Sequence, residues 1–500
     1  MEQPPISQEL TQEQLSELLQ IRRDKLAALK AEGRDPYQQL SFDQSHHSVD
    51  VLKNFDTLEG KVVRVAGRMM SKRIMGKASF AHILDSEGDI QVYVKRDEVG
   101  DLSYADFKSF DIGDIIGVVG TVFKTRTEEV SVHATEVILL SKALRPLPEK
   151  FHGLKDPELR YRQRYVDLFV NTEVRDAFKK RSAIIAGIRN RLNDQGFMEV
   201  ETPVLNTTAS GASARPFVTH HNTLDIDMYL RIATELHLKM CIVGGFEKVY
   251  EIGRLFRNEG MDPTHNPEFT TIELYQAYTD LRGMMAICED LFSYCCKLVN
   301  GTTKISYHGQ ELDLTAPFER MAMNDAVKKY TGADFMACET NEEAIALAKS
   351  IGLDITDKSA TKGKLLPIAF DAFVEDKLVG PVFITEYPVE NSPLTKAIPS
   401  KPGLTDRFEL FICGHEYGNA YSELNDPIVQ RERFIQQAME RQKGDDEAMM
   451  IDEDFCTSLE YGMPPTGGIG IGIDRMVMLL TDSASIRDVL LFPTMKPVDR

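Results

Sequence analysis

The segment from Glu268 to Ala277, EFTTIELYQA, alternates in a way that constrains how this part of the chain can fold. Because successive side chains of a β-strand point to opposite faces, its aliphatic residues fall on one face and Phe269, Glu273 and Tyr275 on the other. A strand that only packs against a core rarely carries a carboxylate beside two aromatic rings, since burying an unpaired charge is costly. The pattern therefore predicts a strand whose second face forms the floor of a polar pocket.

A loop rich in charged groups and imidazole precedes this strand, in the sequence RLFRNEGMDPTHNP. Arg257, Glu259 and His265 lie in the loop or beside it. Loops that are held by rigid strands are the places where binding and catalytic residues concentrate. We therefore expect a functional site here, and the alternative is a solvated hairpin.

A glycine-rich strand near the C-terminus, GGIGIGIDR, is the second unusual feature. Gly468, Gly470 and Gly472 fall on one face, and such glycines often mark the close approach of a ligand or of another backbone. The bare face predicts a flat bed for a planar group, and Arg475 beside it is suited to stack on a base or to hold a phosphate. Neither the dinucleotide-binding nor the P-loop glycine pattern is present here, and tight strand packing is the alternative.

A third polar segment runs from Phe408 to Asn425, FELFICGHEYGNAYSELN. Glu409 and Glu416 are seven residues apart, so an unbroken strand would place them on opposite faces. If both serve one site, Gly414 or Gly418 must break the pleat. Two carboxylates near a phosphate suit Mg²⁺, whereas the alternative is a pair of exposed glutamates. The second half of the segment places three further polar side chains on one strand face: Asn419, Tyr421 and Glu423.

Length, charge and cysteine content limit the class of protein. A chain of 500 residues predicts two to four domains. The net charge of −19 argues against a generally adhesive nucleic-acid binder but leaves room for a local basic stripe. The polar N-terminus lacks a secretory signal, and no apolar run approaches a membrane span. Seven cysteines without a C-x-x-C pair indicate reduced thiols, so we expect a cytoplasmic protein without a membrane partner.

Residues from about 60 to 140 form five short β segments separated by turns, which predicts a small barrel such as an OB-fold. The first segment is strongly basic, and Phe80, His82, Gln91 and Tyr93 follow on the adjacent ones. Basic groups beside aromatic rings suit single-stranded nucleic acid, by phosphate attraction and base stacking. The alternative is an ordinary barrel surface.

Three stretches, taken in order, resemble the signature motifs of class II aminoacyl-tRNA synthetases. The helix and strand that end at Pro203 are similar to motif 1, FRNEG…HNPEF to motif 2 and GGIGIGIDR to motif 3. With ASGASARPF, TELHLK and SELND added, essentially the whole chain resembles the bacterial lysyl-tRNA synthetases.

This resemblance implies an α+β fold. An N-terminal OB-fold β-barrel that reads an anticodon is expected, followed by a class II catalytic domain with a six- or seven-stranded antiparallel β-sheet flanked by helices. The expected boundaries are 1–145 for the N-terminal helix and barrel, 146–170 for a linker, and 171–500 for the catalytic domain, with a small helical insertion at about 325–370. A homodimer is also implied.

The activity implied by the resemblance has two steps. L-lysine and ATP give lysyl-adenylate and pyrophosphate, and lysine then passes to the 3′ end of tRNA(Lys), with Mg²⁺ as the cofactor. Carried over motif by motif, Arg257 and Arg475 are the expected catalytic residues. The residues expected to bind ATP are Arg257, Glu259, His265, Asn266, Phe269, Glu409 and Arg475. Those expected to bind lysine are Gly211, Glu235, Arg257, Glu273, Tyr275, Asn419 and Glu423. Glu409 and Glu416 are expected to hold Mg²⁺, and Phe80 and Gln91 to contact the anticodon.

A charge argument supports this specificity. If Arg257 takes the lysine carboxylate and Glu235 the α-ammonium, then Glu273 and Glu423 remain for the side chain. Two carboxylates attract a cation and repel aspartate, while pocket depth would separate lysine from ornithine and arginine. The alternatives are an aspartyl or asparaginyl relative, a non-catalytic tRNA-binding paralogue, and a ligase that acts on a protein, whose family members lack the barrel.

Overall fold

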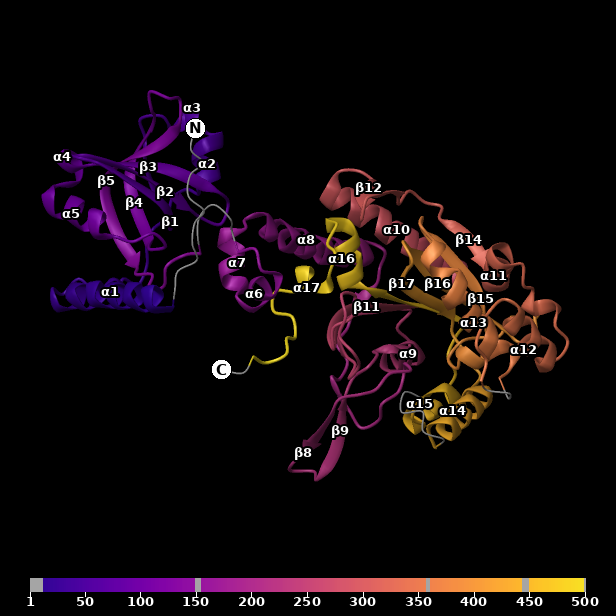
Figure 1. Cartoon of the computed structure of the whole chain (residues 1–500). Helices are drawn as coiled ribbons and strands as arrows, with labels where there is room; N and C mark the ends of the chain where they lie inside the picture. The colour runs from indigo at the N-terminus through magenta and orange to yellow at the C-terminus, as the bar shows by residue number, and fades with distance from the viewer. Residues whose placement is uncertain (1–11, 149–153, 357–359, 443–448, 499–500) are drawn as a thin grey trace. The chain divides into compact units, whose positions relative to one another are not determined.

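The chain divides into two compact units, Met1–Thr172 and Glu173–Arg500, and each is described by itself. The computed structural model describes residues 12–148, 154–356, 360–442 and 449–498 (Figure 1). The start of the predicted N-terminal domain, residues 1–11, lies outside the described residues. So do residues 149–153 of the predicted linker and 357–359 of the predicted insertion.

The first unit contains the barrel that the sequence predicts. Its strands are β1 Val62–Met75, β2 Ala78–Leu84, β3 Asp89–Lys95, β4 Ile115–Lys124 and β5 Val130–Ser141. They close in the order β1-β2-β3-β5-β4. Alternate residues of these strands point inward, so that Val65, Val92 and Val118 are fully buried in one apolar cluster. The predicted OB-fold-like barrel is confirmed.

Helices surround the barrel and follow it in the same unit. They are α1 Gln12–Ala31, η1 Pro36–Gln38, α2 Ser48–Lys53, α3 Phe55–Leu58, α4 Arg96–Val99, α5 Asp101–Ser109, α6 Pro157–Arg162 and α7 Arg164–Val170. Helix α1 is tied to the end of the barrel through Arg22, which donates hydrogen bonds to the carbonyls of Ile112, Ala143 and Arg145. Part of the basic face of this helix therefore lies against protein.

The second unit is built on an eight-stranded sheet, β14-β15-β16-β17-β18-β11-β10-β6. Its strands are β6 Met198–Glu199, β10 Lys248–Phe256, β11 Glu268–Ala277, β14 Glu319–Ala322, β15 Val382–Pro388, β16 Leu404–Ile412, β17 His415–Ser422 and β18 Thr466–Gly472. The central strands are antiparallel, whereas the short edge strands β6 and β14 pair in parallel. These two edges bring the sheet above the six or seven strands implied by the family resemblance.

Three helices cover the apolar face of this sheet: α8 Glu173–Asp194, α10 Leu281–Asn300 and α16 Ile473–Thr481 (Figure 1). Ile272 and Leu274 of β11 and Ile469 and Ile471 of β18 lie in the same buried cluster as these helices. The predicted division of the two strands is thus confirmed, because the carboxylates and glycines are left for the opposite face.

Shorter elements complete the second unit. The helix α9 Glu235–Val243 packs with α14 Pro427–Gln442 and α15 Glu453–Glu460 near the end of β11. The stretch predicted as an insertion contains α11 Met323–Thr331, η2 Phe335–Ala337, α12 Asn341–Ser350 and α13 Lys362–Phe373. The remaining elements are β7 Leu205–Asn206, β8 Val218–His221, β9 Ile226–Leu230, β12 Lys304–Tyr307, β13 Gln310–Asp313, η3 Glu375–Lys377, η4 Val389–Asn391 and α17 Ile486–Val489. Among the described residues, no helix has the length and apolar character of a membrane span.

A buried ammonium joins the last strand of the barrel to the loop before β4. The Lys142 side chain is 2% exposed, and its Nζ lies 2.6 Å from Asp111 and 2.8 Å from Asp114. Asp114 also accepts hydrogen bonds from the backbone N–H groups of Asp111 and Ala143. The network fixes the point where the barrel closes.

We expect Lys142→Met to lower the free energy of unfolding by about 3–5 kcal/mol, because it leaves the fully buried carboxylate of Asp114 without its cation, whereas Asp111 keeps Lys25. Chemical denaturation of the whole chain, followed by circular dichroism, measures the change. The matched control is Lys95→Met, which removes an exposed ion pair with Glu98 and should leave stability unchanged. If Lys142→Met lowers the free energy of unfolding no more than Lys95→Met does, this network does not stabilise the barrel.

Candidate active site on the polar face of the sheet

The strand register places polar residues in two rows across the polar face. One row crosses five strands, from β10 to β16: Glu251, Glu273, Gly470, Asn419 and Glu409. The second row runs parallel to it: Val249, Tyr275, Gly468, Tyr421 and Arg407. In both rows the glycine of β18 lies between the side chains of β11 and β17. The absence of side chains on β18 therefore makes a trough between two polar walls.

The glycine face is only partly open to a ligand. A Cβ atom at Gly468 would lie 2.1 Å from Oε1 of Glu423 and 2.4 Å from the ring of Tyr275. At Gly470 the nearest such contact is 3.6 Å, to Glu273, and at Gly472 it is 3.8 Å, to Arg475. The flat bed expected from the sequence is thus available over the latter two glycines. The first glycine instead makes room for the protein's own side chains.

One end of the trough is acidic and buried. Glu235 begins helix α9, where the helix dipole favours a negative charge, and it accepts a 2.6 Å hydrogen bond from the hydroxyl of Tyr421. Gly211 adopts φ +93°, and a Cβ atom there would lie 3.7 Å from Cβ of Glu235. The structure therefore brings together two of the residues predicted to bind lysine.

Glu273 and Tyr275 lie in the wall of the trough that β11 forms. Glu273 accepts hydrogen bonds from the backbone N–H of Thr234 at 3.2 Å and from the Tyr275 hydroxyl at 3.3 Å. Burial raises the pKa of Glu273 to about 7, with a further contribution from the nearby Glu235. A positively charged ligand beside such a buried carboxyl would stabilise its ionised form.

Glu423 has a partner that the sequence analysis missed. Lys239 and Glu423 are both fully buried, and the Lys239 ammonium forms ion pairs with Glu423 and with Glu235. The signal was available in the sequence, because Glu235 and Lys239 are four residues apart and so share one helix face. Thr234 and Tyr421 are further pocket residues that the site prediction omitted.

Unpartnered buried atoms gather at this site. Among the described residues, buried side-chain atoms without a hydrogen-bond partner include Nε of Arg257, Oγ1 of Thr234 and both carboxylate oxygens of Glu423. Oε2 of Glu423 is the oxygen nearest the Lys239 ammonium, with which it is ion-paired without hydrogen-bond geometry, and Oε1 has no hydrogen-bond partner. Because buried polar groups in folded proteins are normally paired, these atoms indicate a place for a polar ligand.

The other end of the trough is cationic. The guanidinium of Arg257 lies 5.3 Å from the ring centroid of Phe269. Arg475 donates a 2.6 Å hydrogen bond to the carbonyl of Glu416, and its Nη2 lies 2.9 Å from Nε2 of His265. Arg257, Phe269, Arg475 and His265 therefore line this end with two guanidinium groups, a ring and an imidazole. Such a set suits a phosphorylated ligand that carries an aromatic base.

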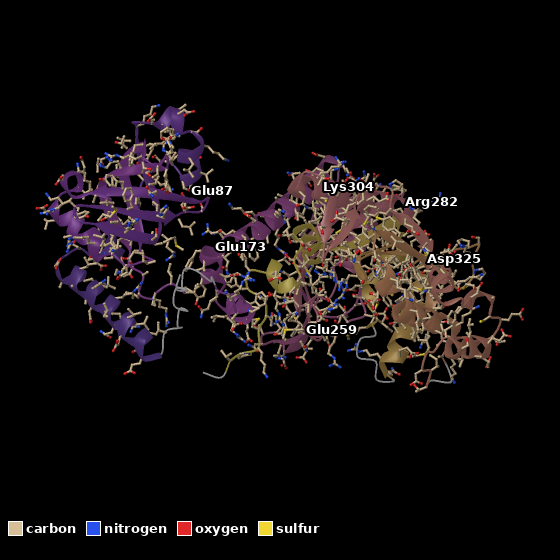
Figure 2. The ribbon with its side chains drawn as sticks, turned by 45° about the horizontal axis from the view of Figure 1, so that its top comes forward. Glu87, Glu173, Glu259, Arg282, Lys304 and Asp325 are labelled. Carbon is tan, nitrogen blue, oxygen red and sulfur yellow. The ribbon has the colours of Figure 1, made fainter. Side chains whose placement is uncertain are left out.

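Two further predicted nucleotide-binding residues, Glu259 and Asn266, lie with Arg257 and His265 in the loop between β10 and β11. Glu259 is exposed, and Figure 2 labels it at the surface of the unit. Asn266 is buried, and its amide donates a 2.7 Å hydrogen bond to the carbonyl of Glu268, which holds the loop. Asp474, which the prediction omitted, fixes the start of α16 by accepting hydrogen bonds from Arg181 and from the N–H of Thr270.

Glu409 and Glu416 come from two strands of one hairpin. The chain turns at Cys413 and Gly414, where φ is +48° and +72°. A register shift then pairs Phe411 with Glu416, so the irregular hairpin returns Glu416 to the face of Glu409. The sequence argument required a break at Gly414 or Gly418, and the structure has the turn at Gly414.

The surroundings of Glu409 show what this carboxylate can do. It accepts hydrogen bonds from Tyr387 at 2.8 Å, Arg407 at 2.5 Å and Asn419 at 3.2 Å. Burial raises its pKa to about 7, and Glu416 adds to the shift. The described residues contain no cluster of three or more metal-ligating side chains. Two close carboxylates nevertheless fit a Mg²⁺ ion that takes its other ligands from phosphates and water.

Asn419 lies across Gly470 from Glu273, and its side chain is hydrogen-bonded to residues of β16. Its side chain accepts a 3.1 Å hydrogen bond from Arg407 and donates to Glu409. The Arg407 guanidinium also lies 4.6 Å from the ring centroid of Tyr387. Asn419 therefore belongs to the network that supports the carboxylate pair.

The barrel carries a separate aromatic surface. Phe80 lies 4.8 Å from Tyr93, and Tyr93 lies 6.0 Å from Phe123 and 5.1 Å from His133, between ring centroids. The predicted residues Phe80 and Gln91 thus lie on neighbouring strands of one face. Gln91 and His82 both contact Glu129, at 2.8 and 3.0 Å, a carboxylate that the sequence analysis missed.

Comparisons with known proteins agree with this architecture. The family model described as tRNA synthetases class II (D, K and N) matches residues 156–496, and that of the OB-fold nucleic acid binding domain matches residues 63–140. A lysine–tRNA ligase of Thermoanaerobacter pseudethanolicus is 58% identical over 485 residues, 97% of each chain. One of Clostridium botulinum is 58% identical over 488 residues, again 97% of each chain. One of Clostridium novyi is 58% identical over 482 residues, 96% of this chain and 94% of the relative. The chain belongs to the class II tRNA synthetase family, in the D, K and N group, with an OB-fold domain before its catalytic domain.

Proposed function

We propose that the chain is a lysine–tRNA ligase that activates L-lysine with ATP and then transfers lysine to the 3′ end of tRNA(Lys). The observation that carries this proposal is the arrangement of charge along the trough. Glu235, Glu273 and Glu423 meet at the buried end, and Arg257 and Arg475 lie at the other. An amino acid with a second ammonium group and a triphosphate match these two ends.

The first step brings two anions together, because the lysine carboxylate attacks the α-phosphate of ATP. Arg257 would bind both groups and offset their repulsion, and its buried Nε, which has no hydrogen-bond partner, leaves a donor for this task. The reaction needs no side-chain nucleophile or general base. Catalysis therefore rests on positioning and on stabilisation of developing charge.

At the nucleotide end, Phe269 and Arg475 would hold the adenine between a ring and a guanidinium. His265 is oriented by a 2.7 Å contact between its Nδ1 and Asp262, which turns its other nitrogen toward Arg475. Glu259, His265 and Asn266 belong to the loop that would close over the nucleotide. Glu409 and Glu416 would hold Mg²⁺, which supplies positive charge to the phosphates when bound.

At the amino-acid end, Gly211 and Glu235 would take the α-amino group. Glu273, Tyr275 and Glu423 would surround the side-chain ammonium, and Asn419 would act on this region through Arg407 and Glu409. In the barrel, Phe80 and Gln91 would contact unpaired bases of the anticodon, because a ring and a neighbouring amide suit stacking and base-edge hydrogen bonds.

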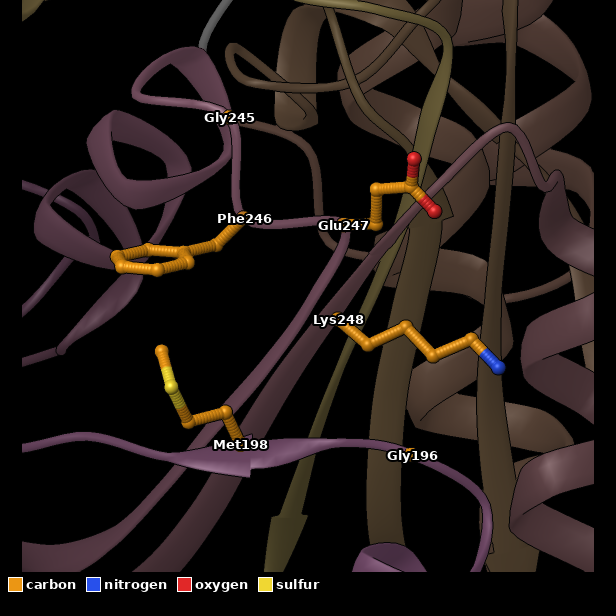
Figure 3. A pocket seen from close by; sticks show the side chains of 6 residues that line it. All are labelled: Gly196, Met198, Gly245, Phe246, Glu247 and Lys248. Atoms are coloured by element: carbon orange, nitrogen blue, oxygen red, sulfur yellow. The ribbon is translucent and has the colours of Figure 1, made fainter.

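A second copy of the chain is the proposed partner at the edge of the sheet. Strand β6 is short and has a free edge, and the exposed side chains of Met198 and Phe246 lie beside it. They line a pocket of about 350 Å³, and Figure 3 shows the Phe246 ring opposite the Met198 side chain. An apolar surface beside an unpaired strand is typical of a protein–protein contact. A homodimer through β6 and the preceding helix α8 would cover it.

The assignment of Glu423 is tested by ATP–pyrophosphate exchange without tRNA. We expect lysine to drive exchange, and Glu423→Gln to raise the KM for lysine by about 30- to 100-fold, since a buried charged partner contributes about 2–3 kcal/mol. The KM for ATP should stay unchanged. The matched control is Glu453→Gln, an exposed glutamate on α15. An equal rise in the KM for lysine and the KM for ATP would contradict the assignment of Glu423 to the lysine pocket. Exchange driven by aspartate or asparagine would favour the alternative specificity.

The raised pKa of Glu273 predicts a pH dependence of lysine binding. Below about 7 the carboxyl holds a proton that the substrate ammonium must displace, so the KM for lysine should rise as the pH falls. The expected slope approaches about tenfold per pH unit. Exchange kinetics between pH 5.5 and 8.5 measure it. Glu273→Gln should remove this dependence, and its persistence in that variant would assign the titration to another group.

The role of the barrel is tested with Phe80→Ala. Loss of one stacked base costs about 1–3 kcal/mol, so we expect the KM for tRNA in the charging reaction to rise by about 10- to 100-fold. Exchange without tRNA should be unaffected. Leu102→Ala, which truncates an exposed apolar side chain of the same unit, is the control. If exchange also fails in Phe80→Ala, the barrel is not a separate tRNA-binding module.

A further inference from the structure

The acidic pocket contains its own ammonium group. Lys239 is fully buried on α9, one helical turn after Glu235, and its Nζ pairs with both Glu235 and Glu423. Its Nζ also lies 5.5 Å from the ring centroid of Tyr421 and 5.8 Å from that of Phe455. A lysine side chain is rarely buried without a specific partner, and here it has two carboxylates that are both assigned to the substrate.

The charges of the site balance only when Lys239 is counted. Counted as formal charges, the three carboxylates of Glu235, Glu273 and Glu423 oppose the cations of Lys239 and Arg257, which leaves one negative charge. L-lysine carries one net positive charge, so the occupied pocket becomes neutral. Without Lys239, Glu235 and Glu423 would be two neighbouring buried carboxylates with no resident cation, which is a costly arrangement.

We propose that Lys239 is a positioning residue for lysine recognition, whose ammonium holds the carboxylates of Glu235 and Glu423 in place for the substrate. The proposal rests on the function proposed above. Its geometric basis is the division of the Glu423 carboxylate: Oε2 faces Lys239, while Oε1 lies over Gly468 without a hydrogen-bond partner. The first oxygen is held by the protein, and the second is available to the ammonium of the substrate.

The electrostatics of the pocket agree with this role. Burial raises the pKa of Glu423 well above its ordinary value, and Lys239 is the neighbour that opposes the shift most. Burial lowers the pKa of Lys239, but Glu235 and Glu423 more than compensate, so it stays protonated. The other titratable or charged groups that face this region are Glu273 and Tyr275 of β11, Tyr421 of β17, and Glu251 of β10 with its partner Arg231.

Two other roles for Lys239 give different results on substitution. If its ammonium only competed with the substrate for Glu423, its removal would tighten lysine binding. If it only supported the fold, its removal would weaken the binding of lysine and of ATP together, without a new pH dependence. If Lys239 positions Glu423, its removal weakens lysine binding alone, and most strongly at the lower pH values where Glu423 holds a proton.

The experiment is ATP–pyrophosphate exchange with Lys239→Met between pH 6 and 9. We expect the KM for lysine to rise about tenfold or more at pH 7 and to recover toward the wild-type value as the pH rises, since each unit of pKa shift corresponds to about a tenfold change. The KM for ATP and kcat at saturating lysine should change by less than about twofold. Lys239→Arg, which keeps the charge, should restore part of the lysine affinity at pH 7.

The double variant Lys239→Met/Glu423→Gln keeps the proposal testable if the single variant folds poorly, because it removes a cation and an anion together. Its KM for lysine should equal that of Glu423→Gln and should lack the added pH dependence, a non-additive result. Lys142→Met, which removes a comparably buried ammonium from the barrel, should leave the KM for lysine unchanged.

An unchanged or lower KM for lysine in Lys239→Met at every pH would overturn the proposal. A rise of similar size in the KM for lysine and the KM for ATP would overturn it as well. These results differ from failure of the proposed function, in which the wild-type chain itself would show no lysine-driven exchange.

Discussion

Burial of negative charge is the constraint on which the amino-acid end of this site depends. Glu235, Glu273 and Glu423 are buried at one end of a sheet, where each would be costly without a compensating group. The chain provides backbone N–H and hydroxyl donors, a helix N-terminus and the ammonium of Lys239. The compensation is incomplete, because Oε1 of Glu423 has no hydrogen-bond partner. That remaining deficit is what a cationic substrate would satisfy.

The antiparallel sheet turns this local chemistry into a directional site. Pairing of β10, β11, β18, β17 and β16 sets residues from distant parts of the chain side by side in rows. The glycines of β18 keep the middle of each row low, so that the side chains of β11 and β17 form walls. Acidic and cationic groups are then separated along the strands. This geometry would hold lysine and ATP end to end, with the reacting groups between them.

Much of this organisation was predictable from the sequence. The barrel strands and the two faces of β11 follow from alternation with a period of two, which depends only on strand geometry. The arrangement of Glu409 and Glu416 was predictable only in part, because parity fails wherever a hairpin turn or an irregular register intervenes. Gly468 looked like ligand space, but the Tyr275 ring and Glu423 cover it. Covering of this kind depends on side chains from two other segments.

The sequence by itself therefore determined the chemical types: which strand faces are polar, which residues can carry charge, and which family the motifs resemble. Only the tertiary structure decided which of these groups meet. Lys239 is an ordinary helix residue in the sequence, yet it lies between Glu235, four residues away, and Glu423, which is distant along the chain. Asn419 shares a strand face with Glu423, yet its side chain bonds Arg407 and Glu409. The physical reason is that local periodicity fixes the direction of a side chain, whereas sheet register and packing fix its neighbours.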